Sequence, residues 1–305
     1  MRFFKKTNID FLGKRNNFYI VSFVVITMGL VGLLFKGMPL GIDFMGGTEL
    51  VVQFQTQQSI RSIRDALNKT GLTKAEIKQY GDPRNILIRT TEQEVGTVIG
   101  DLIKETLAKN FQNNPATLLE ELKIGPKIGA ELRTSALYAV FASLVVMLLY
   151  IGFRFKFIFG VGAVVALFHD VLVTLGVLTL LNGISPFFDF EMDQNMIAAF
   201  LTLVGLSVND SVVIFDRIRE NMKVHKTLSV SEVMNKSINE TLSRTIITSG
   251  TIFVVLSIIM LFGGEVTRGF AFALTIGIIT GTYSSIYIAS AVVYEWSLVQ
   301  KKKAK

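Results

Sequence analysis

The 305-residue sequence contains no cysteine, which excludes disulfide bridges and metal sites built from thiolates. It has only two histidines, His169 and His225, so we predict no histidine-based metal centre. Charged residues make up 18% of the chain, whereas 50% of its residues are hydrophobic. A soluble protein of this composition could not cover its surface with polar groups. We therefore expect an integral membrane protein.

The sequence also lacks a phosphate-binding loop of the form G-x-x-x-x-G-K-[ST], so we expect no ATP hydrolysis by this chain. No nucleophile stands beside the ionisable pair His169-Asp170, and we do not expect an enzyme. The net charge is +7. Because the basic residues lie at the ends of hydrophobic segments, this charge indicates contact with membrane lipid and not with nucleic acid.

Long apolar windows define the membrane-spanning part, because a spanning helix needs about 20 apolar residues. The first window follows a basic N-terminus that includes Arg2, Lys5 and Lys6. It has neither the short apolar core nor the small-residue cleavage site of a secretory signal peptide, so we expect a retained helix. The six windows are residues 17–36, 135–153, 157–181, 195–215, 245–262 and 270–294.

The distribution of lysine and arginine among the short loops predicts the orientation of the chain. Basic residues gather before the first window, after the second and fourth windows, and in the C-terminal tail. The loop at residues 182–194 has no basic residue, and its charged residues are all acidic. Both termini are therefore expected in the cytoplasm. The predicted domains are a cytoplasmic segment at 1–16, the first transmembrane helix at 17–36, an external domain at 37–133, five further helices at 134–296 and a basic cytoplasmic tail at 297–305.

The insert at residues 37–133 has the pattern of a soluble α+β domain. Period-two alternation predicts a first strand near 50–54 and a last strand at 118–124, and Asp82-Pro83 predicts a turn between two central strands. Amphipathic helices are predicted at 59–68 and 95–111. The central strands are placed at 75–80 and 85–90, which gives the order β-α-β-β-α-β of a ferredoxin-like domain.

One acidic residue, Asp210, lies about four turns into the fourth window, where a charge is costly and often marks an ion pathway. Burial favours its neutral form and a nearby cation its charged form, so such a group can load and release a proton. Arg244, one residue before the fifth window, is the natural counter-charge. Two structural alternatives stay open, namely a static buried hydrogen bond or ion pair for Asp210, and an arginine that reaches the lipid headgroups.

Two further features of the windows allow more than one interpretation. His169 and Asp170 lie deep in the third window and Asn209 adjoins Asp210, so these residues can form a proton relay or a satisfied interhelical contact. In the sixth window small residues recur every four positions, which favours close packing within the chain over contact with a partner subunit. The members of this stripe are Ala273, Gly277, Gly281 and Ser285.

Six stretches of the sequence form a set that spans nearly the whole chain. They are Gly41-Ile42-Asp43-Phe44-Met45-Gly46-Gly47-Thr48, Gly125-Pro126-Lys127-Ile128-Gly129, His169-Asp170, residues 209–221, Arg244-Thr245-Ile246-Ile247-Thr248-Ser249 and Gly281-Thr282-Tyr283-Ser284-Ser285. This set resembles the SecF family of protein-export membrane proteins. Leu206 stands where a tyrosine is common in that family, and Ser211 replaces a threonine, which alters the hydrogen bonding expected around Asp210.

The resemblance implies a six-helix half of the resistance–nodulation–division type, with an inserted periplasmic ferredoxin-like domain, in a bacterial inner membrane. It implies a heterodimer with SecD that uses the proton-motive force to help unfolded preproteins leave the Sec translocon. The implied partners are SecD, the translocon channel and the accessory subunits of that channel. The family's intramembrane aspartate and arginine fall on Asp210 and Arg244. Its motif before the periplasmic domain falls on Asp43, Gly46, Gly47 and Thr48. No cofactor is expected, because a gradient of H⁺ or Na⁺ supplies the energy.

Two other functions stay open at this point. A passive scaffold subunit would stabilise a translocon without ion flux, and Asp210 would then be a structural pair whose neutralisation lowers the abundance of the complex. A small-molecule exporter of the same superfamily usually carries two six-helix halves and two larger external domains, whereas this sequence has one half and a small insert.

Overall fold

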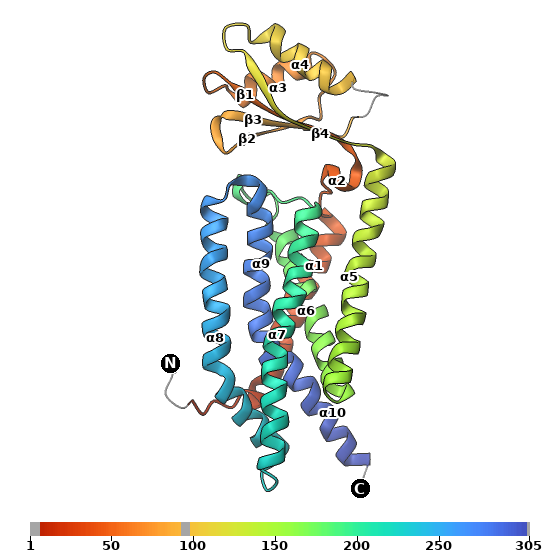
Figure 1. The fold of residues 1–305 in the computed structure, drawn as a ribbon, viewed down its shortest axis with the longest axis vertical. Helices are drawn as coiled ribbons and strands as arrows, with labels where there is room; N and C mark the ends of the chain where they lie inside the picture. The colour runs from red at the N-terminus through yellow and green to blue at the C-terminus, as the bar shows by residue number, and fades with distance from the viewer. Residues whose placement is uncertain (1–6, 93–97, 304–305) are drawn as a thin grey trace.

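A computed structural model describes residues 7–92 and 98–303. In that part of the chain six helices are long and apolar enough to cross a membrane, which confirms the predicted helical membrane domain. They form a bundle with a small sheet domain at one end, and both termini lie at the opposite end (Figure 1). The bundle comprises α1 (Arg15–Lys36), α5 (Pro126–Arg154), α6 (Phe157–Leu181), α7 (Gln194–Val224), α8 (Val230–Phe262) and a last helix made of α9 (Gly264–Ser284), a π-helical turn (Ser285–Ala289) and α10 (Ser290–Lys303).

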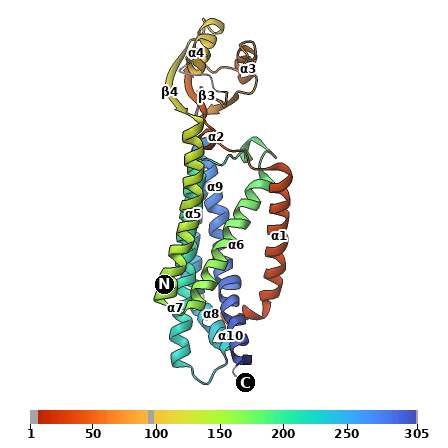
Figure 2. The ribbon, with the colours of Figure 1, turned by 90° about the vertical axis from the view of Figure 1, so that its right-hand side faces the viewer.

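The helices differ in how much of their surface the chain itself covers. At least half of the most apolar window is buried in α6 (50%), α7 (50%) and the last helix (67%), against 11% in α1, 6% in α5 and 17% in α8. Helices α6 and α7 and the last helix therefore form the centre of the bundle. The outer three leave large apolar faces for lipid or another subunit, and Figure 2 shows α1 on the outer side of α6.

The sheet domain, residues 47–124, lies between α1 and α5 in the sequence. Its order β-α-β-β-α-β is the predicted one, and the strands lie in the antiparallel order β2-β3-β1-β4 of a ferredoxin-like fold. Helices α3 and α4 cover one face of the sheet, and the other face looks toward the bundle (Figure 1). The elements are β1 (Gly47–Phe54), α3 (Ile60–Asn68), β2 (Glu76–Tyr80), β3 (Asp82–Thr90), α4 (Val98–Asn110) and β4 (Ala116–Ile124).

The alternation along β1 decides which face of the sheet becomes the domain core. Leu50, Val52 and Phe54 are almost fully buried and pack with apolar residues of α3 and α4, including Ile63 and Ile103. The residues between them point to the face that looks toward the bundle, since side chains alternate along a strand. A polar residue at these alternate positions is therefore available to contact the membrane domain.

Several predicted boundaries were wrong. Arg244 does not precede the fifth spanning helix but lies within α8, which begins at Val230. A capping box between Ser229 and Glu232 starts this helix. The first half of the helix is polar, so a search for long apolar windows does not detect it. Asp82-Pro83 does not form the turn but begins β3, because Gly81 makes the turn with a φ of 67°.

Some predicted features lie outside the described residues. They are the basic residues Arg2, Lys5 and Lys6 and the start of the helix predicted at 95–111, of which α4 is the described part. The same holds for the end of the basic tail, residues 304–305. The domain limits at 16, 36, 133 and 296 stay predictions, because no membrane surface fixes where each helix enters the bilayer.

Helices α1 and α6 cross at a pair of glycines. A Cβ atom placed on Gly29 would lie 2.4 Å from the Cα of Gly176, which is far inside van der Waals contact. The backbones of the two helices are in contact at these glycines, so neither position can carry a side chain unless a helix moves. The packing of α1 on the bundle therefore depends on these two positions.

We predict that Gly29→Ala destabilises the protein by about 1–3 kcal/mol, because α1 must shift to admit one methyl group. Thermal unfolding of the purified protein in detergent measures the effect. Gly205→Ala is the matched control, since nothing lies within 4 Å of a Cβ atom at that position of α7. Equal melting temperatures for the two variants would contradict the close crossing.

Candidate functional site

Asp210 is buried among the helices of the membrane domain. Its side chain is 6% exposed on α7, and the Ser249 hydroxyl on α8 donates a hydrogen bond of 3.1 Å to its carboxylate. Arg244 lies on α8 about one turn before Ser249 and attracts the carboxylate through its charge. The described residues contain no direct ion pair between Arg244 and Asp210. Asp210 is therefore held by a neutral donor, with a cation at a longer distance.

Arg244 itself is exposed and lines a cavity of about 1070 Å³ that residues 7–10 also line. Next to it, the hydroxyl of Thr245 is buried without a hydrogen-bond partner among the described residues. Asn209, which adjoins Asp210 in the sequence, is exposed on the other side of α7. The structure thus brings Asp210, Arg244 and Ser249 together and leaves Asn209 outside this group.

His169 and Asp170 are in direct contact, although neighbouring side chains on a helix usually diverge. The Nδ1 atom of His169 lies 2.9 Å from Oδ1 of Asp170. Nε2 of His169 lies 2.9 Å from the Ser22 hydroxyl and 2.7 Å from the Tyr283 hydroxyl. The six residues of this polar network, which joins α1, α6, α7 and α9, are Ser22, His169, Asp170, Ser207, Tyr283 and Ser284.

The stripe of small residues on the last helix faces the interior of the same chain. A Cβ atom on Gly277 would lie 2.6 Å from Leu203 of α7, and one on Gly281 would lie 3.2 Å from Cβ of Ser207. Ala273 and Ser285 are also buried. Close contact between α7 and the last helix therefore runs along this stripe and includes the polar network.

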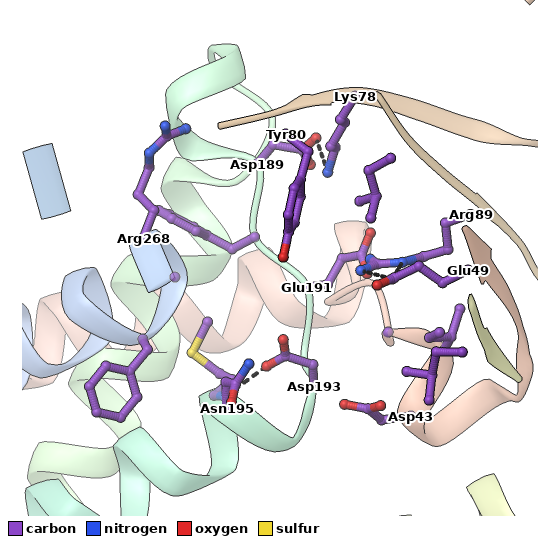
Figure 3. A pocket seen from close by; sticks show the side chains of 18 of the residues that line it. Asp43, Glu49, Lys78, Tyr80, Arg89, Asp189, Glu191, Asp193, Asn195 and Arg268 are labelled. Carbon is purple, nitrogen blue, oxygen red and sulfur yellow. Dashed lines mark hydrogen bonds and ion pairs between the residues drawn. The ribbon is translucent and has the colours of Figure 1, made fainter. Parts of the chain in front are cut away.

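A second cluster of charges joins the sheet domain to the bundle (Figure 3). Arg89 on β3 lies between its cross-strand neighbours Glu49 on β1 and Glu76 on β2, on the face that looks toward the bundle. Its guanidinium is 2.6 Å from Glu49, 3.6 Å from Glu76, and in contact with Glu191 of the α6–α7 loop. The strand register thus places one arginine where three carboxylates meet.

Lys78 on β2 adds a second cation to this cluster. Its ammonium contacts Glu76 and lies 2.8 Å from Asp189 of the same α6–α7 loop. We call the cluster the ionic joint; its members are Glu49, Glu76, Lys78, Arg89, Asp189 and Glu191. Beside it lies a cavity of about 580 Å³, whose walls include Tyr80, Asp193 and Arg268.

Two carboxyls of the ionic joint differ in their affinity for protons. Burial and a hydrogen bond shared with Glu76 raise the pKa of Glu191 to about 8, against the attraction of Arg89. Burial also opposes the ionisation of Glu76, but hydrogen bonds from Glu191 and Lys78 outweigh it and lower the pKa of Glu76. Glu191 therefore binds a proton more readily than Glu76 does.

The stretch that links α1 to the sheet domain also holds the start of α7. The Asp43 carboxylate, on the short helix α2 (Ile42–Met45), accepts a hydrogen bond of 2.9 Å from the backbone N–H of Gln194. Asp193 accepts one of 2.7 Å from Met196, so two carboxylates cap α7. Nearby, Leu40 and Met192 form a parallel backbone bridge.

The glycines of the same motif fit this tight connection. Gly46 has a φ of 78°. A Cβ atom on Gly47 would lie 2.4 Å from the carbonyl oxygen of Thr90. Thr48 is buried as β1 begins. The start of α5 packs on this turn, because a Cβ atom on Gly129 would lie 2.9 Å from the backbone nitrogen of Gly46.

The sequence analysis missed the ionic joint. Its members lie on three strands and a distant loop, so local periodicity gives no sign of them. One signal was present: residues 182–194 carry three acidic residues and no basic one, which predicts a cationic surface opposite this loop. No group of three histidine, aspartate or glutamate residues able to hold a metal ion occurs within residues 7–92 and 98–303.

Comparison with known proteins identifies the family. Residues 102–299 match the family model described as "Protein export membrane protein SecD/SecF, C-terminal", and residues 31–58 match "SecD/SecF GG Motif". This chain belongs to the SecD/SecF family. The resemblance carried by the sequence motifs is therefore confirmed.

Curated relatives point to the SecF branch of the family. Protein translocase subunit SecF of Rhodothermus marinus is 47% identical over 295 residues, covering 97% of this chain and 95% of that protein. The SecF of Calditerrivibrio nitroreducens is 42% identical over 301 residues, with 97% and 96% covered. The chain thus matches SecF proteins over nearly their full length.

Solved structures share the fold. SecDF of Thermus thermophilus, described as a translocon-associated membrane protein, has a TM-score of 0.81 and 35% identity, covering 95% of this chain. SecDF in a super-membrane-facing form has a TM-score of 0.73 and 34% identity. The chain spans 39% and 40% of the length of these two proteins. The predicted six-helix bundle with an inserted ferredoxin-like domain is confirmed, and the chain is a multi-pass membrane protein.

We predict that pH controls the ionic joint through Glu191. Its pKa rises from 4.5 to about 8 in the folded joint, so between these values the closed joint binds more protons than the open one. The free energy that holds the joint closed therefore falls as pH rises through this window. The equilibrium constant for closing the joint decreases by at most about tenfold per pH unit. Hydrogen exchange of residues 183–193, corrected for the intrinsic pH effect, measures this change.

Glu191→Gln should remove this pH dependence, because its amide donates to Glu76 at every pH. Glu105→Gln, which changes an exposed carboxylate of α4, is the control and should leave the dependence in place. The interpretation is wrong if the wild-type protein and Glu191→Gln show the same slope of exchange against pH.

Proposed function

We propose that this chain is the SecF subunit of the Sec protein-export machinery, in a heterodimer with SecD. The complex uses the proton-motive force to promote preprotein translocation across the bacterial inner membrane and release on its outer side. Both chain termini lie in the cytoplasm, and the sheet domain lies in the periplasm. The observation that carries the proposal is a buried carboxylate, Asp210, with a cation near but not bound to it.

Asp210 is placed to exchange a proton because its contacts do not fix it in either the charged or the neutral form. A direct ion pair would hold the carboxylate charged, whereas a single hydroxyl donor from Ser249 can remain bonded in both states. Arg244, in the wall of the cytoplasmic cavity, favours the charged form from a distance. A carboxylate from SecD completes the path in our proposal.

Energy from one proton is sufficient to bias a helix movement. One charge that crosses 100 mV releases about 2.3 kcal/mol. Shifting a two-state equilibrium almost completely from one state to the other requires about 5.5 kcal/mol, which about two to three protons per cycle would supply. The protonation of Asp210 then changes how α7 packs against α8.

Helix α7 offers a route from this change to the sheet domain. Asp210 lies about 24 Å from the start of the helix, at about 1.5 Å per residue. That start is capped by Asp43, which belongs to the link between α1 and β1. A shift of α7 along its axis therefore pulls directly on the segment that enters the sheet domain, where emerging preprotein is held or released.

Two observations support a separate SecD subunit. The SecDF structures contain more than twice the length of this chain, which covers 39% of one and 40% of the other. The outer helices α1, α5 and α8 also leave most of their apolar windows uncovered by this chain. A second six-helix half would cover part of that surface and supply the missing carboxylate. The Sec channel, its accessory subunits and membrane lipid are the further contacts we propose.

We predict that Asp210→Asn abolishes export. The experiment depletes cells of the native protein, rescues them with wild type or variant at matched membrane levels, and follows a signal-peptide-bearing reporter. Export should fall to the depleted level, because the amide cannot carry a proton. Proton flux through the reconstituted complex with SecD should also fall, by about tenfold or more.

The control for this experiment is Asp65→Asn, which removes an exposed carboxylate of α3 and should rescue fully. If Asp210→Asn rescues export and conducts protons as well as the wild type does, the scaffold function replaces the one proposed. If depletion itself leaves export intact, the assignment to protein export fails.

We predict that Asp43→Ala uncouples proton flux from protein export. It removes one of two caps on α7, at a cost of about 1 kcal/mol, so the helix stays folded through Asp193. Proton flux should remain within about twofold of wild type while export falls several-fold, because the pull of α7 no longer reaches β1. Flux and export are measured on the same proteoliposomes.

Ser229→Ala provides the matched control for the loss of a helix cap. It breaks the capping box of α8 at similar energetic cost, far from the sheet domain. Export should survive this change. A parallel fall of flux and export in Asp43→Ala would show that the residue only stabilises the fold.

A further inference from the structure

Asp170 is the most deeply buried acidic side chain in the described part of the chain. It is fully buried on α6, and its carboxylate contacts His169, Ser207 and Ser284. None of these partners is a lysine or arginine. A buried carboxylate without a cation is very unstable, so the pair His169–Asp170 must hold a proton between its two members to remain neutral.

The hydroxyl groups around His169 suit a proton that can leave and return. Nε2 of His169 meets both Ser22 and Tyr283, whose own hydroxyls are 2.8 Å apart. A hydroxyl can donate or accept, so this triangle remains hydrogen-bonded whether Nε2 carries a proton or not. A static pair would need only one fixed donor at that position. The network thus satisfies both protonation states of the imidazole.

The charge on Asp170 also holds two other helices in place. Ser207 of α7 donates a hydrogen bond of 2.6 Å to Oδ2 of Asp170, and Ser284 of the last helix donates one of 2.8 Å to the same atom. Hydrogen bonds to a charged acceptor are about twice as strong as neutral ones. Protonation of Asp170 therefore loosens α7 and the last helix from α6 at one point.

That point is one helical turn from Asp210. Ser207 and Asp210 are three residues apart on α7, a spacing that puts both on the same side of the helix. Gly281 allows the close approach that completes the contact, since a Cβ atom there would lie 3.3 Å from the Ser207 hydroxyl and 3.5 Å from Oδ2 of Asp170. The two buried carboxylates consequently act on the same turn of the same helix.

We propose that His169 and Asp170 form a second proton-binding site of the membrane domain, coupled through Ser207 and α7 to Asp210. The proposal rests on the proposed function, in which Asp210 carries the transported proton. When the shared proton moves from His169 to Asp170, the pair stays neutral but the hydrogen bond from Ser207 weakens, so α7 moves only when both sites are in the correct state. The groups that face the pair are Ser22 from α1, Ser207 and, one turn on, Asp210 from α7, and Tyr283 and Ser284 from the last helix.

The first test replaces the titrating group and retains its hydrogen bonding. His169→Gln keeps an amide donor and acceptor but cannot titrate. Proton flux and export of the full chain with SecD are measured from about pH 5 to about pH 9, the range in which histidine titrates. We expect membrane levels within about twofold of wild type and a pH midpoint of flux shifted by at least about 1 unit.

The matched control is Ser290→Ala, which removes a fully buried hydroxyl of the last helix that bonds only to Ser285 of the same helix. It should leave the pH profile unchanged. An unchanged profile in His169→Gln as well would assign the pair a structural role and overturn the proposal. Asp210→Asn, measured in parallel, reports separately on the proposed function.

The second test reads the site directly and does not depend on transport. The chain has two histidines, so His225→Gln leaves His169 as the one imidazole of this subunit. Nitrogen NMR of the ¹⁵N-histidine-labelled full chain, in lipid nanodiscs with unlabelled SecD, follows its protonation. We expect the nitrogen shifts of His169 to change with pH and to differ between the wild-type and Asp210→Asn backgrounds. A His169 signal that does not change with pH would overturn the proposal, even if His169→Gln fails to fold.

Discussion

The rest of the structure depends on the cost of placing charge inside a bundle of apolar helices. Asp170 and Asp210 are both buried there, and neither has a lysine or arginine as a direct partner within the described residues. Serine hydroxyls from neighbouring helices supply their interhelical hydrogen bonds, beside the contact of Asp170 with His169, and a serine side chain is short. The helices that carry these hydroxyls must therefore approach closely, which explains why Gly277 and Gly281 face α7.

Helix α7 is where these requirements meet. It contributes Ser207 to one carboxylate and carries the other, Asp210, one turn later. It also begins under two carboxylate caps, of which Asp43 comes from the segment that leads into β1. In the function we propose, an axial movement of α7 at Asp210 is passed through the first residue of the helix, Gln194, to Asp43. The family motif around Gly46 and Gly47 thus has a mechanical explanation in this chain.

Sequence alone predicted the apolar helices, the sheet order and the two buried acids, since hydropathy, period-two alternation and the cost of charge are local signals. It misplaced Arg244, because the polar first half of α8 is helical for reasons of capping and not of hydropathy. It also could not find Ser22 or Ser207 as partners of His169 and Asp170, because a serine in an apolar helix resembles ordinary helix sequence. Contacts between distant segments, such as Arg89 with Glu191, leave no periodic trace.

The centre of the bundle and the ionic joint use different interactions for a physical reason. Within the bundle a full ion pair would fix the carboxylate in its charged form and stop it exchanging protons, so hydroxyls serve better there. At the ionic joint Arg89 and Lys78 offset the charge of the carboxylates around them, although burial opposes ionisation there. Burial raises the pKa of Glu191 to about 8. In the function we propose, a shift of α7 therefore acts next to a joint whose strength depends on pH through Glu191.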